Sequence, residues 1–122
     1  EGDYYVRTKK RLSAFYPTDL EFLLHNLGVE NVVITGVMTD ACCLSTAFDA
    51  ANRDFRVIMP RDVVGGYTEE FENAALQIVS MHLGLVVDAP TLLSEYFARK
   101  DMSLPGDLSG IKDINEVCEA ID

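Results

Sequence analysis

The sequence predicts an α/β fold in which a parallel sheet carries helices on both faces, in the three-layer manner of Rossmann-like proteins. Apolar, β-branched runs alternate along the chain with segments whose apolar residues recur at helical spacing. This alternation is typical of βαβ units, whose strands are parallel. The run 32–34 is apolar throughout, as expected of a strand that is buried on both faces. The pattern therefore favours a layered parallel sheet.

The first elements follow from local patterns. Residues 4–8 predict a short strand that leads into a loop, 9–17. Thr18 and Glu21 have the spacing of a capping box, which opens a helix that Gly28 ends.

The central segment predicts a strand, a glycine turn and a helix. Residues 31–35 form the strand, Gly36 makes the turn, and the helix runs to Arg53 with Cys42 in its first turn. Ligands of open α/β sheets lie at the carboxyl ends of strands, where Cys42 is expected. Free amides and the helix dipole favour a thiolate there. The alternative is that Cys42 is a buried small apolar residue, as most free cysteines are.

The remaining elements alternate in the same way. A strand at 55–59 is closed by Pro60, and a helix capped by Thr68 follows it, with a buried stripe of Phe71, Ala75, Ile78 and Val79. After Gly84 come a strand at 85–87 and a loop at 88–90. The last two elements are a helix that is capped by Thr91 and runs to about Lys100, and a weak helix at 113–120. Residues 1–100 are expected to be the C-terminal part of one domain, and 101–122 an acidic tail with six acids against one lysine.

Bulk composition narrows the functional classes. The 122 residues carry a net charge of −10, which argues against nucleic acid or an anionic membrane as partner. No apolar run approaches the roughly 18 residues of a transmembrane helix, and the N-terminus has no signal-peptide pattern. Three cysteines, two of them adjacent, give no disulfide framework, so a cytoplasmic setting is expected.

The predicted sheet is incomplete at its N-terminal side. A wholly apolar parallel strand such as 32–34 expects neighbours on both edges, yet the chain offers about four strands. We therefore expect an N-terminal companion segment or chain.

Four fragments together resemble the isochorismatase-like cysteine hydrolase family. They are a lysine four residues before Ser13-Ala-Phe15, the helix start Thr18-Asp-Leu20, the strand end Gly36-Val-Met-Thr-Asp-Ala-Cys42, and the helix Thr46-Ala-Phe-Asp-Ala50. They occur in the family's order and spacing over residues 3–96. The resemblance implies an isochorismatase-like fold and a catalytic set of aspartate, lysine and cysteine.

The resemblance places two members of that set in this sequence. The lysine falls on Lys9 and the nucleophile on Cys42, while Lys10 is one position too close to Ser13. A non-proline cis peptide after the glycine would be Val37–Met38, and it would aim the Met38 amide at the same point as the Cys42 amide, forming an oxyanion hole. The family's aspartate lies far upstream of the lysine, and Asp3 is too close to Lys9 to match it.

Residues near the lysine are candidates for substrate contact. Arg11, Phe15 and Tyr16 flank Lys9 on one loop, although Phe15 could instead be a buried aromatic anchor. Asp40 is expected to cap the helix that carries Cys42.

We expect neither a metal site nor a cofactor. His25 and His82 lack paired metal-ligand spacing, and Gly65-Gly66 lacks a phosphate-binding pattern. The resemblance implies a homo-oligomer.

Two functions remain open at this point. The first is a cysteine-dependent hydrolase that cleaves a C–N bond in a small amide, carbamoyl or ureido compound, since ether-cleaving isochorismatases do without the cysteine. The second is a catalytically inactive family member that serves as a binding or assembly module. A redox role for the pair Cys42–Cys43 is disfavoured, because adjacent cysteines on a helix point apart.

Overall fold

The computed structural model describes residues 2–98. Its elements are α1 (Leu20–Asn26), β1 (Asn31–Val33), β2 (Gly36–Val37), η1 (Thr39–Cys43), α2 (Leu44–Asn52), β3 (Arg56–Pro60), β4 (Val64–Gly65), α3 (Glu69–Ile78), η2 (Val79–Leu83), β5 (Gly84–Val87) and α4 (Ala89–Ala98). The turns η1 and η2 are π-helical. The predicted tail, 101–122, and its weak helix lie outside the described residues.

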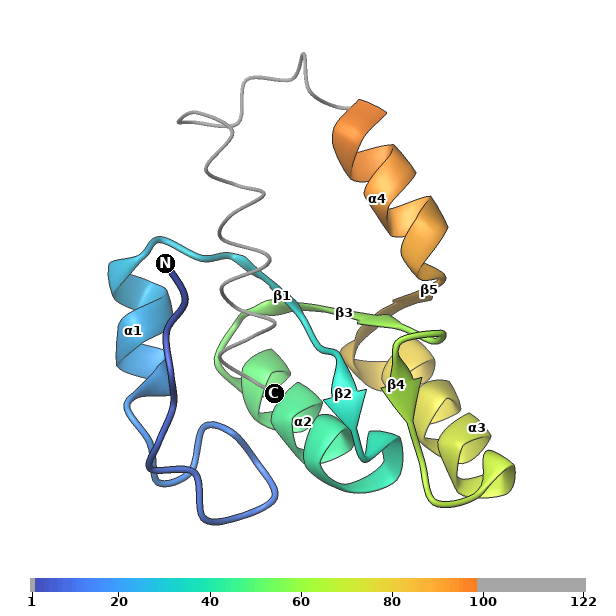
Figure 1. Ribbon diagram of the computed structural model, residues 1–122, viewed down its shortest axis with the longest axis horizontal. Helices are drawn as coiled ribbons and strands as arrows, with labels where there is room; N and C mark the ends of the chain where they lie inside the picture. The colour runs from blue at the N-terminus through green and yellow to red at the C-terminus, as the bar shows by residue number, and fades with distance from the viewer. Residues whose placement is uncertain (1, 99–122) are drawn as a thin grey trace.

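The strands form two parallel sheets, which confirms the predicted fold class. The main sheet has the order β1–β3–β5, and β2 pairs with β4 in a second, two-stranded sheet. In Figure 1, α2 and α3 lie side by side below the main sheet, while α4 leaves β5 on the opposite side. Within the described residues, β1 is an edge strand of the main sheet.

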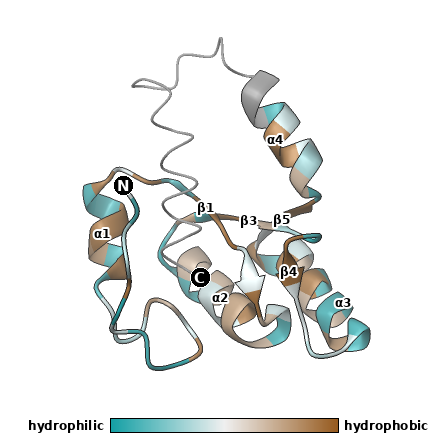
Figure 2. Ribbon diagram, in the orientation of Figure 1, coloured by the Kyte–Doolittle hydropathy of each residue, from teal (hydrophilic) through white to brown (hydrophobic). Residues whose placement is uncertain are grey.

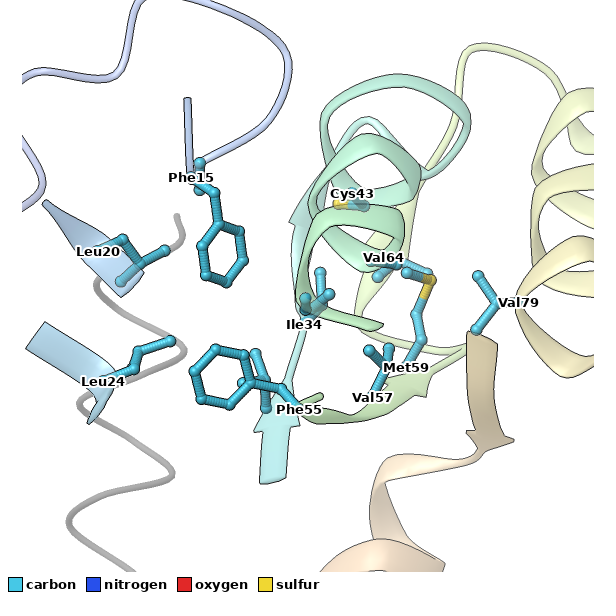
Figure 3. Close-up of a cluster of buried hydrophobic side chains, with 14 residues drawn as sticks. Phe15, Leu20, Leu24, Ile34, Cys43, Phe55, Val57, Met59, Val64 and Val79 are labelled. Carbon is cyan, nitrogen blue, oxygen red and sulfur yellow. The ribbon is translucent and has the colours of Figure 1, made fainter. Parts of the chain in front are cut away.

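The core lies between the main sheet and the helices below it. Figure 2 shows the apolar character of β3 and β5, and α3 alternates between apolar and polar residues. In Figure 3, two phenylalanines stand between α1 and the sheet, and smaller side chains fill the space towards α3. The buried cluster comprises Ala14, Phe15, Leu20, Leu24, Val32, Ile34, Cys43, Ala47, Ala50, Phe55, Val57, Met59, Val64 and Val79.

The N-terminal prediction was wrong in two respects. Residues 4–8 form no strand; they run as irregular backbone into a turn. The capping box is also absent, because Asp19 is the N-cap of α1 and makes no side-chain capping bond. Glu21 instead accepts a hydrogen bond from Arg53 at 2.8 Å. The side chain that was expected to cap the start of α1 therefore links α1 to the end of α2.

The C-terminal predictions were partly confirmed. The Thr68 side chain caps α3 by accepting from the Phe71 amide, as predicted. Of the predicted buried stripe, Ala75 and Val79 are buried, whereas Phe71 is 55% exposed and Ile78 is 36% exposed. α4 begins earlier than expected, at Ala89.

The start of α4 is held by two aspartates. Asp88 Oδ1, rather than Thr91, provides the capping oxygen, which accepts from the Thr91 amide at 2.8 Å. Asp62 Oδ1 accepts from the Ala89 amide at 2.7 Å. None of the helices in residues 2–98 is long and apolar enough to cross a membrane.

Candidate active site

A pocket of about 170 Å³ opens at the carboxyl end of β1. Its lining comes from four segments that are distant in sequence: Lys9 from the N-terminal loop, Thr35, Gly36 and Val37 from the end of β1 into β2, Cys42 and Cys43 from η1, and Thr46 from α2. The location is the strand end at which the sequence predicted the cysteine.

Lys9 and Cys42 face each other in this pocket. Lys9 Nζ lies 3.9 Å from Cys42 Sγ, a distance at which the ammonium can donate to sulfur. The same ammonium donates to the Arg11 carbonyl at 2.8 Å. Lys10, the rival from the sequence, is exposed and does not line the pocket. The structure thus brings together the lysine and the cysteine that the resemblance selected.

A tight turn presents the cysteine. Gly36 has a φ of 106°, which residues with a Cβ rarely adopt, and the peptide Val37–Met38 is cis. The Met38 carbonyl accepts from the amides of Ala41 and Cys43 at 3.1 and 3.0 Å, which closes the first turn of η1. Cys42 lies within that turn, so the backbone fixes the direction of its side chain.

The loop that carries Lys9 is anchored through buried contacts. The Ala14 amide donates to Thr46 Oγ1 at 3.0 Å, and Thr46 is itself 1% exposed. The Thr18 hydroxyl donates to the Ala14 carbonyl. Phe15 is buried and stacks on Phe55 with 6.0 Å between ring centroids. These contacts hold the loop against α2 and the sheet.

The predicted substrate contacts lie elsewhere. Phe15 is the buried anchor that the sequence had left as an alternative, and it does not line the pocket. Arg11 and Tyr16 are exposed and are also absent from the lining. The sequence reasoning missed Thr35 and Thr46, although Thr35 ends the predicted strand 31–35 and Thr46 begins the fragment Thr46-Ala-Phe-Asp-Ala50.

Polar groups around the cysteine depart from expectation. Asp40 was expected to cap the helix, but the N-cap of η1 is Met38 and no side chain makes a capping bond. Asp40 Oδ1 and Thr39 Oγ1 are buried and have no hydrogen-bond partner within residues 2–98. Among those residues, no aspartate or glutamate lines the pocket, and no three potential metal ligands cluster.

Comparison with known proteins identifies the family. The model of the isochorismatase domain matches residues 1–91. Nicotinamidase 3 of Arabidopsis thaliana is 36% identical over 84 residues, which are 69% of this chain and 42% of the plant protein. Maleamate amidohydrolase of Pseudomonas putida is 38% identical, over 67% of this chain and 38% of that enzyme.

Solved structures show the same fold. An isochorismatase-like hydrolase from Alkaliphilus metalliredigens superposes with a TM-score of 0.70 and 34% identity, covering 72% of this chain and 48% of the other. The class defined by fold and pocket is therefore an α/β domain with parallel strands and a cysteine at a strand end. The chain belongs to the isochorismatase family. It spans less than half the length of these relatives.

Proposed function

We propose that Cys42 is the nucleophile of a hydrolase that cleaves a C–N bond in a small amide, carbamoyl or ureido compound. The observation that carries the proposal is the 3.9 Å approach of Lys9 Nζ to Cys42 Sγ in a strand-end pocket. A neighbouring ammonium favours the thiolate, the form that attacks a carbonyl carbon. Relatives named as a nicotinamidase and a maleamate amidohydrolase support the same class of reaction.

The proposed reaction proceeds in two steps. The sulfur attacks the carbonyl carbon, and the Met38 and Cys42 amides stabilise the oxyanion that forms. A carboxylate takes the thiol proton and gives it to the nitrogen, so that the C–N bond breaks and a thioester remains. Water then attacks the thioester, releasing the carboxylic or carbamic acid and restoring the thiol. No acidic side chain among residues 2–98 lines the pocket, so we expect this carboxylate from outside those residues or from a companion chain.

Ammonia release tests this function. The natural gene product should release ammonia from one or more compounds of a panel of primary amides that includes nicotinamide, carbamoyl compounds and ureas. Cys42→Ala should abolish that release, whereas Cys118→Ser, which changes a cysteine outside the described residues, should retain it. Ammonia release by Cys42→Ala at the wild-type rate would refute the nucleophile.

The second candidate is the catalytically inactive binding or assembly module. The pocket favours it in one respect, since no acidic side chain among the described residues lines it. That function needs no thiolate, so Cys42 would react with iodoacetamide no faster than an ordinary exposed cysteine. Fast alkylation at neutral pH would exclude this candidate in favour of the hydrolase.

A further inference from the structure

The loop between β4 and α3 contacts η1 at a point with no free space. The Gly66 amide donates to Glu72 Oε2 at 3.0 Å. A Cβ placed on Gly66 would lie 3.0 Å from the Cβ of Glu72 and 3.1 Å from Asp40 Oδ1. Both distances are shorter than ordinary van der Waals contact, so a side chain at position 66 would require Glu72 or Asp40 to shift.

Asp40 connects this contact to the cysteine. It lies two residues before Cys42 in the same π-helical turn. Its buried Oδ1 has no hydrogen-bond partner within residues 2–98. Close packing against Gly66 therefore supports η1 at Asp40, and the hydrogen bond to Glu72 holds Gly66 in place.

We propose that Glu72 is a positioning residue for Cys42. By holding the Gly66 amide, its carboxylate keeps Gly66 packed against Asp40, and η1 then keeps Cys42 Sγ within reach of Lys9 Nζ. The inference rests on the proposed function only in taking Cys42 as the reactive thiol. It adds a residue from α3, an element that contributes nothing to the lining of the pocket.

The direction in which replacement of Glu72 changes the reaction rate of Cys42 distinguishes a positioning role from a purely electrostatic one. Lys9 from the N-terminal loop favours the thiolate, whereas the carboxylates of Asp40 on η1 and Glu72 on α3 would disfavour it through space. Removal of the Glu72 charge should therefore speed the reaction of Cys42 if the charge alone matters. If Glu72 positions the turn, loss of its side chain should slow the reaction.

The experiment measures iodoacetamide alkylation of Cys42 in the whole chain, assigned by tandem mass spectrometry, as a function of pH. Glu72→Ala should lower the rate at neutral pH about fivefold, the factor that corresponds to the roughly 1 kcal/mol of one hydrogen bond. Glu72→Gln should react at the wild-type rate or faster, because its amide oxygen can accept from the Gly66 amide while the opposing charge is removed. Glu70→Ala, an exposed acid in the same first turn, should leave the profile unchanged.

Each outcome is decisive. A wild-type or faster rate in folded Glu72→Ala overturns the proposal, as does an equal loss in Glu72→Gln or Glu70→Ala. If circular dichroism shows that Glu72→Ala is unfolded, Glu72→Asp, which is one methylene shorter, replaces it under the same criteria. Slow alkylation of the wild-type chain itself would instead count against the proposed function, so the two failures are distinguishable.

Discussion

At the scale of single residues, the pocket depends on Lys9, whose loop is anchored to α2 by a buried hydrogen bond. Lys9 belongs to irregular backbone, and the nearest regular element, α1, begins at Leu20. Its loop is fixed where the Ala14 amide meets the Thr46 hydroxyl. Because Thr46 lies on the same helix that follows η1, one helix orients both the ammonium and the thiol.

Replacement of Lys9 should therefore change the reactivity of the thiol more than the stability of the fold. Lys9→Met keeps the length of the side chain and removes its charge. A partly exposed ion pair contributes up to about 1 kcal/mol, so iodoacetamide alkylation of Cys42 at neutral pH should slow by about fivefold. Lys10→Met removes the same charge from the exposed neighbour and should not change the rate. Equal rates for the two variants would contradict the assignment of Lys9.

The sequence alone could select this lysine but not the role of Phe15. Lys9 and Lys10 differ by one position, and the offset from Ser13 decided between them. Phe15 could not be assigned, because the ring that buries it, Phe55, lies on another element and is brought to it only by the packed fold. Arg11 and Tyr16 remain predictions as substrate contacts.

At the scale of elements, β3 and β5 pair at a glycine that has no room for a side chain. Gly84 pairs with Val57, and a Cβ on Gly84 would lie 2.0 Å from the Val57 carbonyl oxygen. Gly84→Ala should therefore force the strands apart and cost at least about 1–3 kcal/mol in the free energy of unfolding. Urea denaturation measures the change. Gly65→Ala is the matched control, because its Cβ would meet Val37 at an ordinary 3.4 Å; a similar loss in both variants would contradict the explanation.

The beginning of α4 makes a pH-dependent contribution. Hydrogen bonds from the side chain and backbone of Thr91 lower the pKa of Asp88 below its ordinary value of 3.8. The folded state therefore favours the carboxylate: its contribution is complete above the unfolded pKa and is lost as the pH falls through the lowered one. Carbon-13 NMR of the Asp88 carboxyl should show a midpoint below 3.8. Thr91→Val, which keeps the backbone amide, should raise that midpoint, and an unchanged midpoint would remove the hydroxyl as a cause.

Element prediction succeeded where the pattern was long and failed where pairing is non-local. The strand at 55–59 and the helix capped by Thr68 were predicted from periodicity and capping alone. The pair β2–β4 was missed, because strands of two residues are too short to show periodicity and are defined only by their pairing with each other. Phe71 was wrongly assigned to the core, since its spacing matches the buried face but the start of α3 extends beyond the main sheet (Figure 1).

At the scale of the whole molecule, the described residues hold part of the proposed hydrolytic site. The cysteine, the turn that presents it and the lysine that faces it are in place. Amide hydrolysis also requires a group that moves a proton to the leaving nitrogen. No acidic side chain among residues 2–98 lines the pocket, and the chain spans less than half the length of the plant nicotinamidase and of the Alkaliphilus hydrolase. The sequence could predict this shortage, because the family's strand-borne aspartate has no counterpart upstream of Lys9.

We therefore expect the acid of the complete protein to be an aspartate outside residues 2–98. Its replacement by asparagine should lower ammonia release by at least about a hundredfold, the lower end of general acid–base catalysis, while Cys42 remains open to alkylation. Ammonia release and alkylation should respond differently, because transfer of the proton to the leaving nitrogen is lost whereas the ammonium of Lys9 still favours the thiolate. The measurement is an Asp→Asn scan of the natural gene product and of any chain that copurifies with it. Wild-type turnover in every variant of an aspartate outside residues 2–98 would contradict this expectation. Asp40, whose buried Oδ1 has no hydrogen-bond partner within residues 2–98, would then be the group to replace next.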